Sequence, residues 1–176
     1  LLEQLAEEAP ETEEIPATPI HLFLSKQGYF KKISPQSLRM SGEQKYKEGD
    51  GPAFHWETTT AAELLFFTNR QQCYKAFAYT FDDSKASVLG DYLPAKLEMD
   101  EGETILWAGL AGDYTGTLLF FFENGKVARV PLSAYQTVTR RKKLTGAAAS
   151  DVDQACLEVT QEDPLGAYAV DYIKYD

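Results

Sequence analysis

The stretch from Leu118 to Leu144, LLFFFENGKVARVPLSAYQTVTRRKKL, predicts a β-hairpin followed by a basic cluster. An apolar, aromatic run leads to Asn124-Gly125, and the chain then returns through Lys126 to Pro131. Aromatic and β-branched residues favour strands, and Asn-Gly is the strongest short-range hairpin signal. The stretch ends in four consecutive cations, Arg140 to Lys143. It therefore predicts a strand-turn-strand unit with positive charge beside it.

The same hairpin pattern occurs three times in the chain. Leu22–Ile33, Leu65–Ala76 and Leu119–Val130 align without gaps, at successive offsets of 43 and 54 residues. Each copy has an aromatic-rich first half, a turn, and a cation at the same place in the returning half, which is Lys32, Lys75 or Arg129 in turn. This spacing is typical of four-stranded blades in propeller-like folds. The repeat therefore predicts an all-β chain of about three blades.

Other segments fill in this organisation. The stretch 34–51 is polar and rich in Gly, so we expect a loop there. Residues 92–97 have only a weak pattern, and we expect them to form a connection. Further strands are expected near 53–58, 104–108, 145–149, 154–160 and 167–173. We expect residues 1–18 to be an acidic linker or the end of a preceding helix and 19–176 to be the β-rich part, with repeat units near 20–60, 61–112 and 113–176.

The charge of the chain is concentrated at its two ends. The formal net charge is −10, which at first argues against a polyanionic partner. Residues 1–14 hold six acids and no cation, residues 150–176 hold seven acids and one cation, and 15–149 hold 16 Lys and Arg against 14 acids. The middle is therefore mildly basic. The start at Leu1 is expected to mark a fragment of a longer chain.

Residues that could carry catalysis are sparse. His21 and His55 lie 34 residues apart with no acidic or cysteine companion at ligand spacing, so we expect strand or loop residues and not ligands or bases. The acid pairs Asp82-Asp83 and Asp100-Glu101 are expected in solvated turns. Cys73 and Cys156 form no CxxC pair and are expected to be buried thiols. The sequence therefore predicts no catalytic residue, no metal site and no cofactor.

The cations give a stronger indication of function. If equivalent positions on successive blades lie along one circumference, their cations could form a curved positive band suited to the phosphates of bent DNA. The candidate DNA-binding residues are Lys31, Lys32, Arg39, Lys45, Lys47, Lys75, Arg129, Arg140, Arg141, Lys142 and Lys143. No base-reading motif is visible, so binding is expected to be independent of sequence and sensitive to salt. Two alternatives remain open: ordinary solvated surface charge, or a protein-interaction propeller whose acidic ends contact a partner.

Several linked stretches resemble one family, the C-terminal domain of the A subunit of bacterial type II topoisomerases, which are DNA gyrase and topoisomerase IV. These stretches are GYFKKISPQSLR (28–39), LLFFTNRQQCYKAFAYTFDDSKASVLGDYLP (64–94), LEMDEGETI (97–105) and LFFFENGKVARVPLSAY (119–135). They occur in order, and the resemblance covers about residues 20–149. By this resemblance the fold would be a partial β-pinwheel, a ring of four-stranded blades with exchanged strands, whose basic rim binds and bends DNA.

The resemblance also implies the setting of the chain. The parent would be an ATP-hydrolysing isomerase whose catalytic tyrosine lies outside this chain. Its partners would be duplex DNA, the remainder of the A subunit and the ATPase B-type subunit, in the bacterial cytoplasm near the nucleoid and away from any membrane. The chain departs from the gyrase pattern at Gln36–Lys47, which replaces the Gln-Arg-Arg-Gly-Gly-Lys-Gly box. This departure favours a subunit like that of topoisomerase IV.

Overall fold

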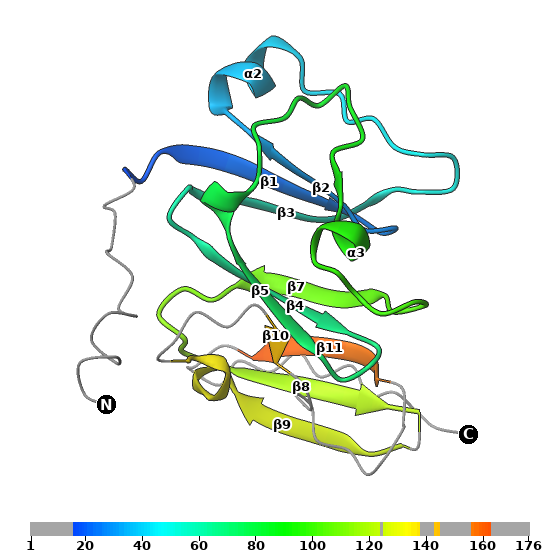
Figure 1. Cartoon of the computed structure of the whole chain (residues 1–176). Coiled ribbons are helices and arrows are strands. Elements are labelled where there is room, and N and C mark those ends of the chain that lie inside the picture. Colours follow the sequence, from blue (N-terminus) through cyan, green and yellow to red (C-terminus); the bar gives the residue numbers. More distant parts are fainter. Residues whose placement is uncertain (1–15, 124, 138–142, 145–155, 163–176) are drawn as a thin grey trace, which may run out of the picture.

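Three antiparallel sheets follow one another through the molecule (Figure 1). The computed structural model describes residues 16–123, 125–137, 143–144 and 156–162. The first sheet has the strand order β3-β1-β2-β6 and consists of β1 (Pro19–Ser25), β2 (Tyr29–Ile33), β3 (Pro52–Thr59) and β6 (Asp91–Tyr92). The second has the order β10-β5-β4-β7 and consists of β4 (Glu63–Thr68), β5 (Cys73–Phe77), β7 (Ile105–Leu110) and β10 (Lys143–Leu144). In the third, β8 (Thr117–Phe122) lies between β9 (Val127–Pro131) and β11 (Cys156–Glu162).

The three sequence repeats form structurally equivalent hairpins. In the first hairpin Leu22 lies opposite Lys32. The same register places Leu65 opposite Lys75 in the second hairpin and Leu119 opposite Arg129 in the third. The predicted repeat is therefore confirmed at the level of individual strand pairs.

The turns of the three hairpins share one backbone conformation. Gly28, Gln71 and Gly125 are equivalent residues, and their φ angles are 95°, 58° and 81°. Glycine adopts this left-handed region at little cost, whereas a residue with a Cβ is strained there. The middle repeat is therefore strained at Gln71 in a way that the other two avoid.

Short strands are exchanged between successive sheets. β6 follows the second hairpin in the chain but pairs with β2 of the first sheet, where Tyr92 lies opposite Tyr29. β10 follows the third hairpin but pairs with β5 of the second sheet, where Leu144 lies opposite Cys73. Each of these two sheets is thus completed by the repeat that follows it, which is the strand exchange expected of a β-pinwheel.

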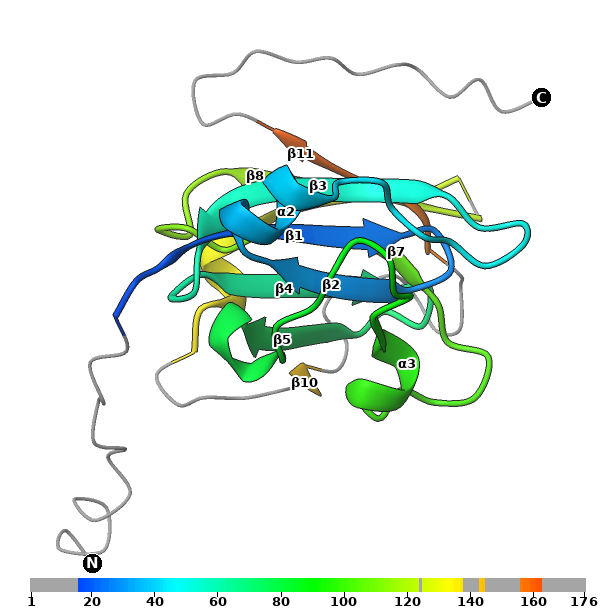
Figure 2. The same cartoon turned by 90° about the horizontal axis from the view of Figure 1, so that it is seen from above.

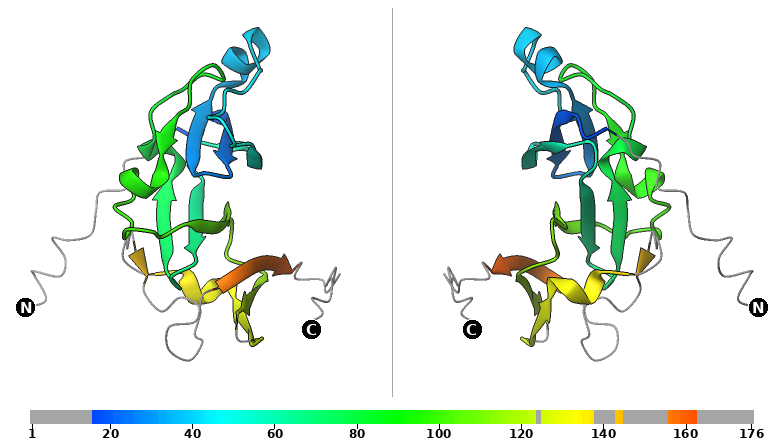
Figure 3. Two further views of the ribbon diagram at one scale, coloured as in Figure 1. Left: turned by 90° about the vertical axis from the view of Figure 1, so that its right-hand side faces the viewer. Right: turned by 90° about the vertical axis from the view of Figure 1, so that its left-hand side faces the viewer.

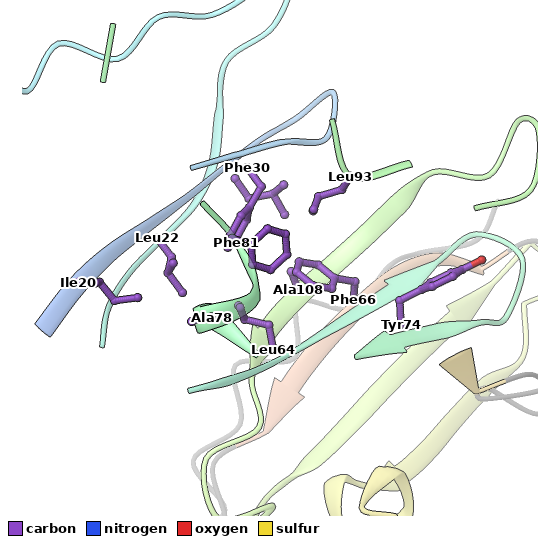
Figure 4. Close-up of a cluster of buried hydrophobic side chains, with 11 residues drawn as sticks. Ile20, Leu22, Phe30, Leu64, Phe66, Tyr74, Ala78, Phe81, Leu93 and Ala108 are labelled. Carbon is purple, nitrogen blue, oxygen red and sulfur yellow. The ribbon is translucent and has the colours of Figure 1, made fainter. Parts of the chain in front are cut away.

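Two apolar cores join the sheets. The first lies between the first and second sheets and includes Leu22, Phe30, Leu64 and Phe66, as Figure 4 shows. The second lies between the second and third sheets and is built around Phe67, where aromatic rings pack at centroid distances of 4.8–5.8 Å. Alternate side chains of one strand point to opposite faces, so Phe66 and Phe67 of β4 serve one core each.

The sheets are arranged along a curved path (Figure 3). Seen from above, the strands of successive sheets run along nearly one common direction (Figure 2). As a result, the three hairpin turns lie on the same side of the molecule, at the right in Figure 1. None of the helices in the described ranges combines the length and apolar composition needed to cross a membrane.

The short helices were not expected from the sequence. Residues 34–51 do not form one continuous loop, because α2 (Pro35–Met40) occupies the first part. The Ser34 hydroxyl caps this helix by accepting a hydrogen bond from the Ser37 amide at 3.2 Å, and Pro35 stands at its first turn. Both are recognised start signals. The expected connection 92–97 contains part of β6 and all of α3 (Leu93–Lys96). Two 3-10 turns, η1 (Ala78–Thr80) and η2 (Leu132–Tyr135), follow the second and third hairpins.

The strands predicted outside the three hairpins agree with the structure where the structure describes them. The segments 53–58, 104–108 and 154–160 correspond to β3, β7 and β11. The predicted strands 145–149 and 167–173 lie outside the described residues.

Candidate nucleic-acid interface

Three of the candidate DNA-binding cations are buried and hold the fold together. These buried lysines are Lys31, Lys32 and Lys75, which are only 4%, 8% and 8% exposed. A buried ammonium group must be paired or hydrogen-bonded within the protein. Each of the three has such partners, and the partners come from segments far along the chain.

Lys75 fastens the segment that follows the third hairpin. Its Nζ donates to the Tyr135 carbonyl oxygen at 3.0 Å and to Thr137 Oγ1 at 3.1 Å. It also lies 3.4 Å from Glu63 Oε1 and 5.5 Å from the centre of the Tyr114 ring. Because Tyr135 and Thr137 lead toward β10, Lys75 holds the chain on its way to the exchanged strand.

Lys31 and Lys32 do the same for the segment that follows the second hairpin. Lys31 Nζ donates to the Ala86 carbonyl oxygen at 2.9 Å and to Gln44 Oε1 at 2.9 Å. Burial lowers the pKa of Lys31 below its ordinary value. Lys32 Nζ lies 3.4 Å from Asp83 Oδ1, and the Lys32 carbonyl oxygen accepts from the Ser84 amide at 2.8 Å. These contacts fix residues 83–86 on the way to β6.

The other described candidates are exposed. Arg39 lies in the last turn of α2, and Lys45 and Lys47 lie in the segment that joins α2 to β3. Lys47 Nζ lies 5.4 Å from the centre of the Tyr29 ring, and a hydrogen bond to that side chain raises the pKa of Lys47. Arg129 is an exposed residue of β9. All four side chains remain accessible to a ligand.

Asp50 positions the loop that carries Lys45 and Lys47. Its Oδ1 accepts from the Gln27 amide at 2.9 Å and from the Gly51 amide at 2.8 Å, so the loop is tied to the turn between β1 and β2. Burial raises the pKa of Asp50, but hydrogen bonds from Ser25, Gly51 and Gln27 outweigh it and hold the pKa below its usual value. The carboxylate therefore stays charged and keeps these cations beside the first hairpin turn.

The four-cation run is described only at its last residue. Arg140, Arg141 and Lys142 lie outside the described residues. Lys143 begins β10, where its Nζ is 3.9 Å from Asp100 Oδ2 and 5.5 Å from the centre of the Tyr74 ring. Lys143 is exposed, and its ion pair with Asp100 links the exchanged strand β10 to the segment that joins α3 to β7.

Three further cations were missed by the sequence reasoning. Lys26, Arg70 and Lys126 lie in or directly beside the turns of the first, second and third hairpins, and all three are exposed. We call them the turn cations. Because the three turns lie on one side of the molecule (Figure 1), the turn cations follow one another along that side. Each turn carries a cation at a different place in the repeat, so the gapless alignment of the repeats does not pair the three residues.

The histidines lie in strands, as expected, but they have an acidic neighbour that was not expected. Pairing of β1 with β3 places His21 opposite Glu57, and His55 lies on the same strand as Glu57 two residues away. The Nδ1 atom of His21 is 3.0 Å from His55 Nε2 and 3.9 Å from Glu57 Oε1. The inference that the histidines lack an acidic companion is therefore wrong, because Glu57 lies two residues from His55 on β3 and strand pairing places it opposite His21.

The structure also places Cys73 and the two acid pairs that the sequence analysis considered. Cys73 is fully buried, and burial raises the pKa of its thiol to about 12. A thiol in that state supplies almost no thiolate near neutral pH. The acids Asp82, Asp83, Asp100 and Glu101 are exposed, as expected, and Glu101 lies in a turn, but Asp83 forms a β-bridge with Lys32 instead of lying in a turn.

Comparison with known proteins identifies related sequences. No family model matches the chain. Over 129 residues it is 27% identical to the A subunit of DNA topoisomerase 4 from Bacillus subtilis, a match that covers 71% of this chain and 16% of that protein. The corresponding protein of Staphylococcus aureus is 23% identical over 134 residues, with 74% of this chain and 17% of that protein covered. The chain thus spans about a sixth of the length of these relatives.

Solved structures agree with the sequence matches. The crystal structure of the C-terminal domain of DNA topoisomerase IV superposes with a TM-score of 0.77 at 25% identity, over 84% of this chain and 46% of that chain. The E. coli ParC C-terminal domain superposes with a TM-score of 0.63 at 17% identity, over 82% of this chain and 56% of that chain, and supports the fold. The sequence and structural similarities together confirm the resemblance seen in the sequence. They support the interpretation of this chain as a C-terminal domain from the A subunit of a type II topoisomerase.

Proposed function

We propose that the chain is a non-catalytic module that binds and bends duplex DNA within the A subunit of a type II topoisomerase. The observation that carries the proposal is the row of turn cations on equivalent hairpin turns along one side of a curved stack of sheets. The exposed side chains of Arg39, Lys45, Lys47 and Arg129 add to this positive charge. The similarity to the A subunits of topoisomerase IV supports DNA as the ligand.

Phosphate contact is the mode of binding that these residues suit. Contacts of lysine and arginine side chains with phosphates carry no sequence information, and the release of counterions makes such binding weaken steeply with salt. Cations spaced along a curved surface contact more phosphates on bent DNA than on straight DNA. That gain offsets the elastic cost of bending, which is of order 1–6 kcal/mol for a site of 20–30 base pairs.

The buried lysines have a different part in this proposal. Lys31 and Lys75 already donate to internal oxygens, and Lys32 is paired with the exposed carboxylate of Asp83, so contact with a phosphate would require these interactions to break. Their role is to hold the segments that lead to the exchanged strands, and so to keep the hairpins aligned. Arg140, Arg141 and Lys142 stay predictions as phosphate contacts.

The partners follow from the same proposal. The remainder of the A subunit would place this module beside the DNA that the enzyme cleaves, and the B-type subunit would supply ATP hydrolysis. Within that assembly the module would support the control of supercoiling, or relaxation and decatenation, by bending the bound duplex.

The experiment is a titration of the chain against linear duplex DNA of mixed sequence at two salt concentrations. We expect binding at about 50 mM salt and a loss of affinity of tenfold or more at about 200 mM salt. Two unrelated duplexes should bind equally, because phosphate contacts carry no sequence information. An absence of binding at the lower concentration would overturn the proposal and favour a protein-interaction module.

A further inference from the structure

The first sheet carries a cluster of metal-ligating side chains on its neighbouring strands β1 and β3. His21 projects from β1, and His55 and Glu57 project from the edge strand β3. Residues two apart on one strand share a face of the sheet, so His55 and Glu57 both face the side of His21. Three potential ligand atoms, one from each residue, lie within 4.8 Å of one another.

The distances between these atoms suit a single small cation. An ion in tetrahedral coordination, at metal–nitrogen distances of about 2.0–2.1 Å, holds its ligand atoms about 3.3 Å apart. The separation of His21 Nδ1 and His55 Nε2 is 3.0 Å, and that of His21 Nδ1 and Glu57 Oε1 is 3.9 Å. The two distances bracket the required value, and small rotations about side-chain bonds close the difference.

The rings are already oriented for this role. Phe23 stacks on His55 with a centroid distance of 4.2 Å and an interplanar angle of 7°, and His21 stacks on His55 at 5.3 Å. These contacts restrict rotation of the imidazoles and lower the entropy lost when a ligand is bound. The side chain of Glu57 is 77% exposed, so the site opens to solvent and water can complete the coordination.

The donor set selects the class of ion. Neutral imidazole suits zinc, copper and nickel, whereas calcium and magnesium prefer oxygen ligands. Two histidines and one glutamate with an open position form a ligand set that proteins use for zinc. In the absence of metal, one histidine donates to the other. Binding needs only that each neutral ring carry its proton on the nitrogen that faces away from the ion.

We propose that His21, His55 and Glu57 form a surface site for one divalent transition-metal ion, with Zn²⁺ as the representative. A bound ion would join β1 to the edge strand β3 and stabilise the first sheet by ligand linkage. This site is independent of the proposed DNA contacts, because none of its three residues is a cation of the DNA-binding set.

Calorimetric titration of the full chain with ZnCl2 tests the site. We expect one ion per chain, and His55→Ala should weaken binding by about tenfold or more, since even outer-shell changes cost 10–100-fold in metal affinity. Glu57→Gln should also weaken binding. Glu48→Gln, which changes an exposed acid outside the cluster, and Cys156→Ser should both bind as the unmodified chain does. Unchanged affinity in His55→Ala would overturn the proposal.

Nuclear magnetic resonance of the unmodified chain gives a second readout that needs no variant. The chain has only two histidines, so every imidazole signal comes from His21 or His55. Zinc should shift the ring signals of both residues at one equivalent, and MgCl2 should shift neither. If saturating zinc moves only one ring or none, the three residues do not share an ion, and the contact between the histidines is only a hydrogen bond.

Discussion

Lys75 in β5 and Arg129 in β9 are equivalent residues of successive hairpins, yet one side chain is buried and the other is exposed. The strand register that surrounds them is the same, since each lies opposite the equivalent leucine of its neighbouring strand. What differs is the chain around the side chain. Residues 135–137 reach over the second hairpin and accept the hydrogen bonds of Lys75.

This difference separates two roles that a repeated cation can have. A repeat fixes where a side chain stands in its hairpin, and the segment leading to the exchanged strand decides whether that side chain is covered. Lys32, which occupies the same place in the first hairpin, is covered by residues 83–84 and behaves as Lys75 does. Recurrence in the sequence is therefore evidence for a shared position and not for a shared function.

The largest effect is expected from Lys75→Met. Methionine keeps the apolar stem but removes the cation that pairs with Glu63, whose side chain is only 18% exposed, and removes the donor to the Tyr135 carbonyl and the Thr137 hydroxyl. Loss of one partner of a buried ion pair should lower the free energy of unfolding by about 3 kcal/mol. Urea denaturation measures this change.

The matched control is Arg129→Met at the equivalent exposed position. It should change the free energy of unfolding by no more than about 0.5 kcal/mol. Equal losses in the two variants would show that burial does not separate their roles.

A second expected effect is a loss of stability at alkaline pH, caused by two residues of β5 in the second sheet. Burial raises the pKa of the Cys73 thiol from 9.0 to about 12. Burial, followed by the hydrogen bond to Glu103, raises the pKa of Tyr74 above 10.0. The folded state therefore holds these protons more tightly than the unfolded chain does. Their contribution to the free energy of unfolding should be fully present below pH 9.0 and should be lost as the pH rises toward about 12.

The variant Tyr74→Phe measures how much of this loss of stability comes from Tyr74. The variant should show a shallower fall in unfolding free energy above pH 10.0, whereas Tyr92→Phe, at a tyrosine 47% exposed in β6, should follow the unmodified chain. Denaturation curves recorded at several pH values give the slopes. A flat profile across the alkaline range in the unmodified chain would refute the assignment.

The smallest effect is expected at the hairpin turns. Gln71→Gly should raise the free energy of unfolding by about 0.5–1 kcal/mol, because glycine adopts the left-handed conformation at φ 58° without the strain that a Cβ causes there. Gly125→Ala at the equivalent residue should lower it by about 1 kcal/mol. A Cβ at Gly125 meets no atom within 4 Å, so the loss would report backbone strain alone. Thermal melts that move both variants in the same direction would contradict the equivalence of the turns.

The hairpins and their repeat could be predicted from sequence because local signals specify them. Aromatic runs, turn residues and the recurring Lys32, Lys75 and Arg129 are all visible in the chain. The strand exchange was expected only from the family resemblance, because β6 and β10 are two residues long and pair with strands distant in sequence. Such short strands leave no periodic pattern.

The candidate site was predicted less well than the fold. Exposure of Lys31, Lys32 and Lys75 depends on which distant segment packs over them, and sequence spacing does not report that. The neighbourhood of His21 and His55 was missed for the same reason, since it arises from the pairing of β1 with β3. The turn cations leave no recurring position in the repeat, because each lies at a different place in its turn, and only the folded arrangement brings the three turns to one side.

The salt dependence of DNA binding tests the central claim that exposed cations contact DNA and buried ones do not. The variants to compare are Arg129→Gln, Lys32→Met at the equivalent buried position, and a triple replacement of Lys26, Arg70 and Lys126 by glutamine. The slope of the logarithm of the binding constant against the logarithm of salt concentration should decrease by about 1 for Arg129→Gln and by about 2–3 for the triple variant. Folded Lys32→Met should keep the slope of the unmodified chain. A reduced slope in Lys32→Met, with unchanged slopes in the other two variants, would contradict the account.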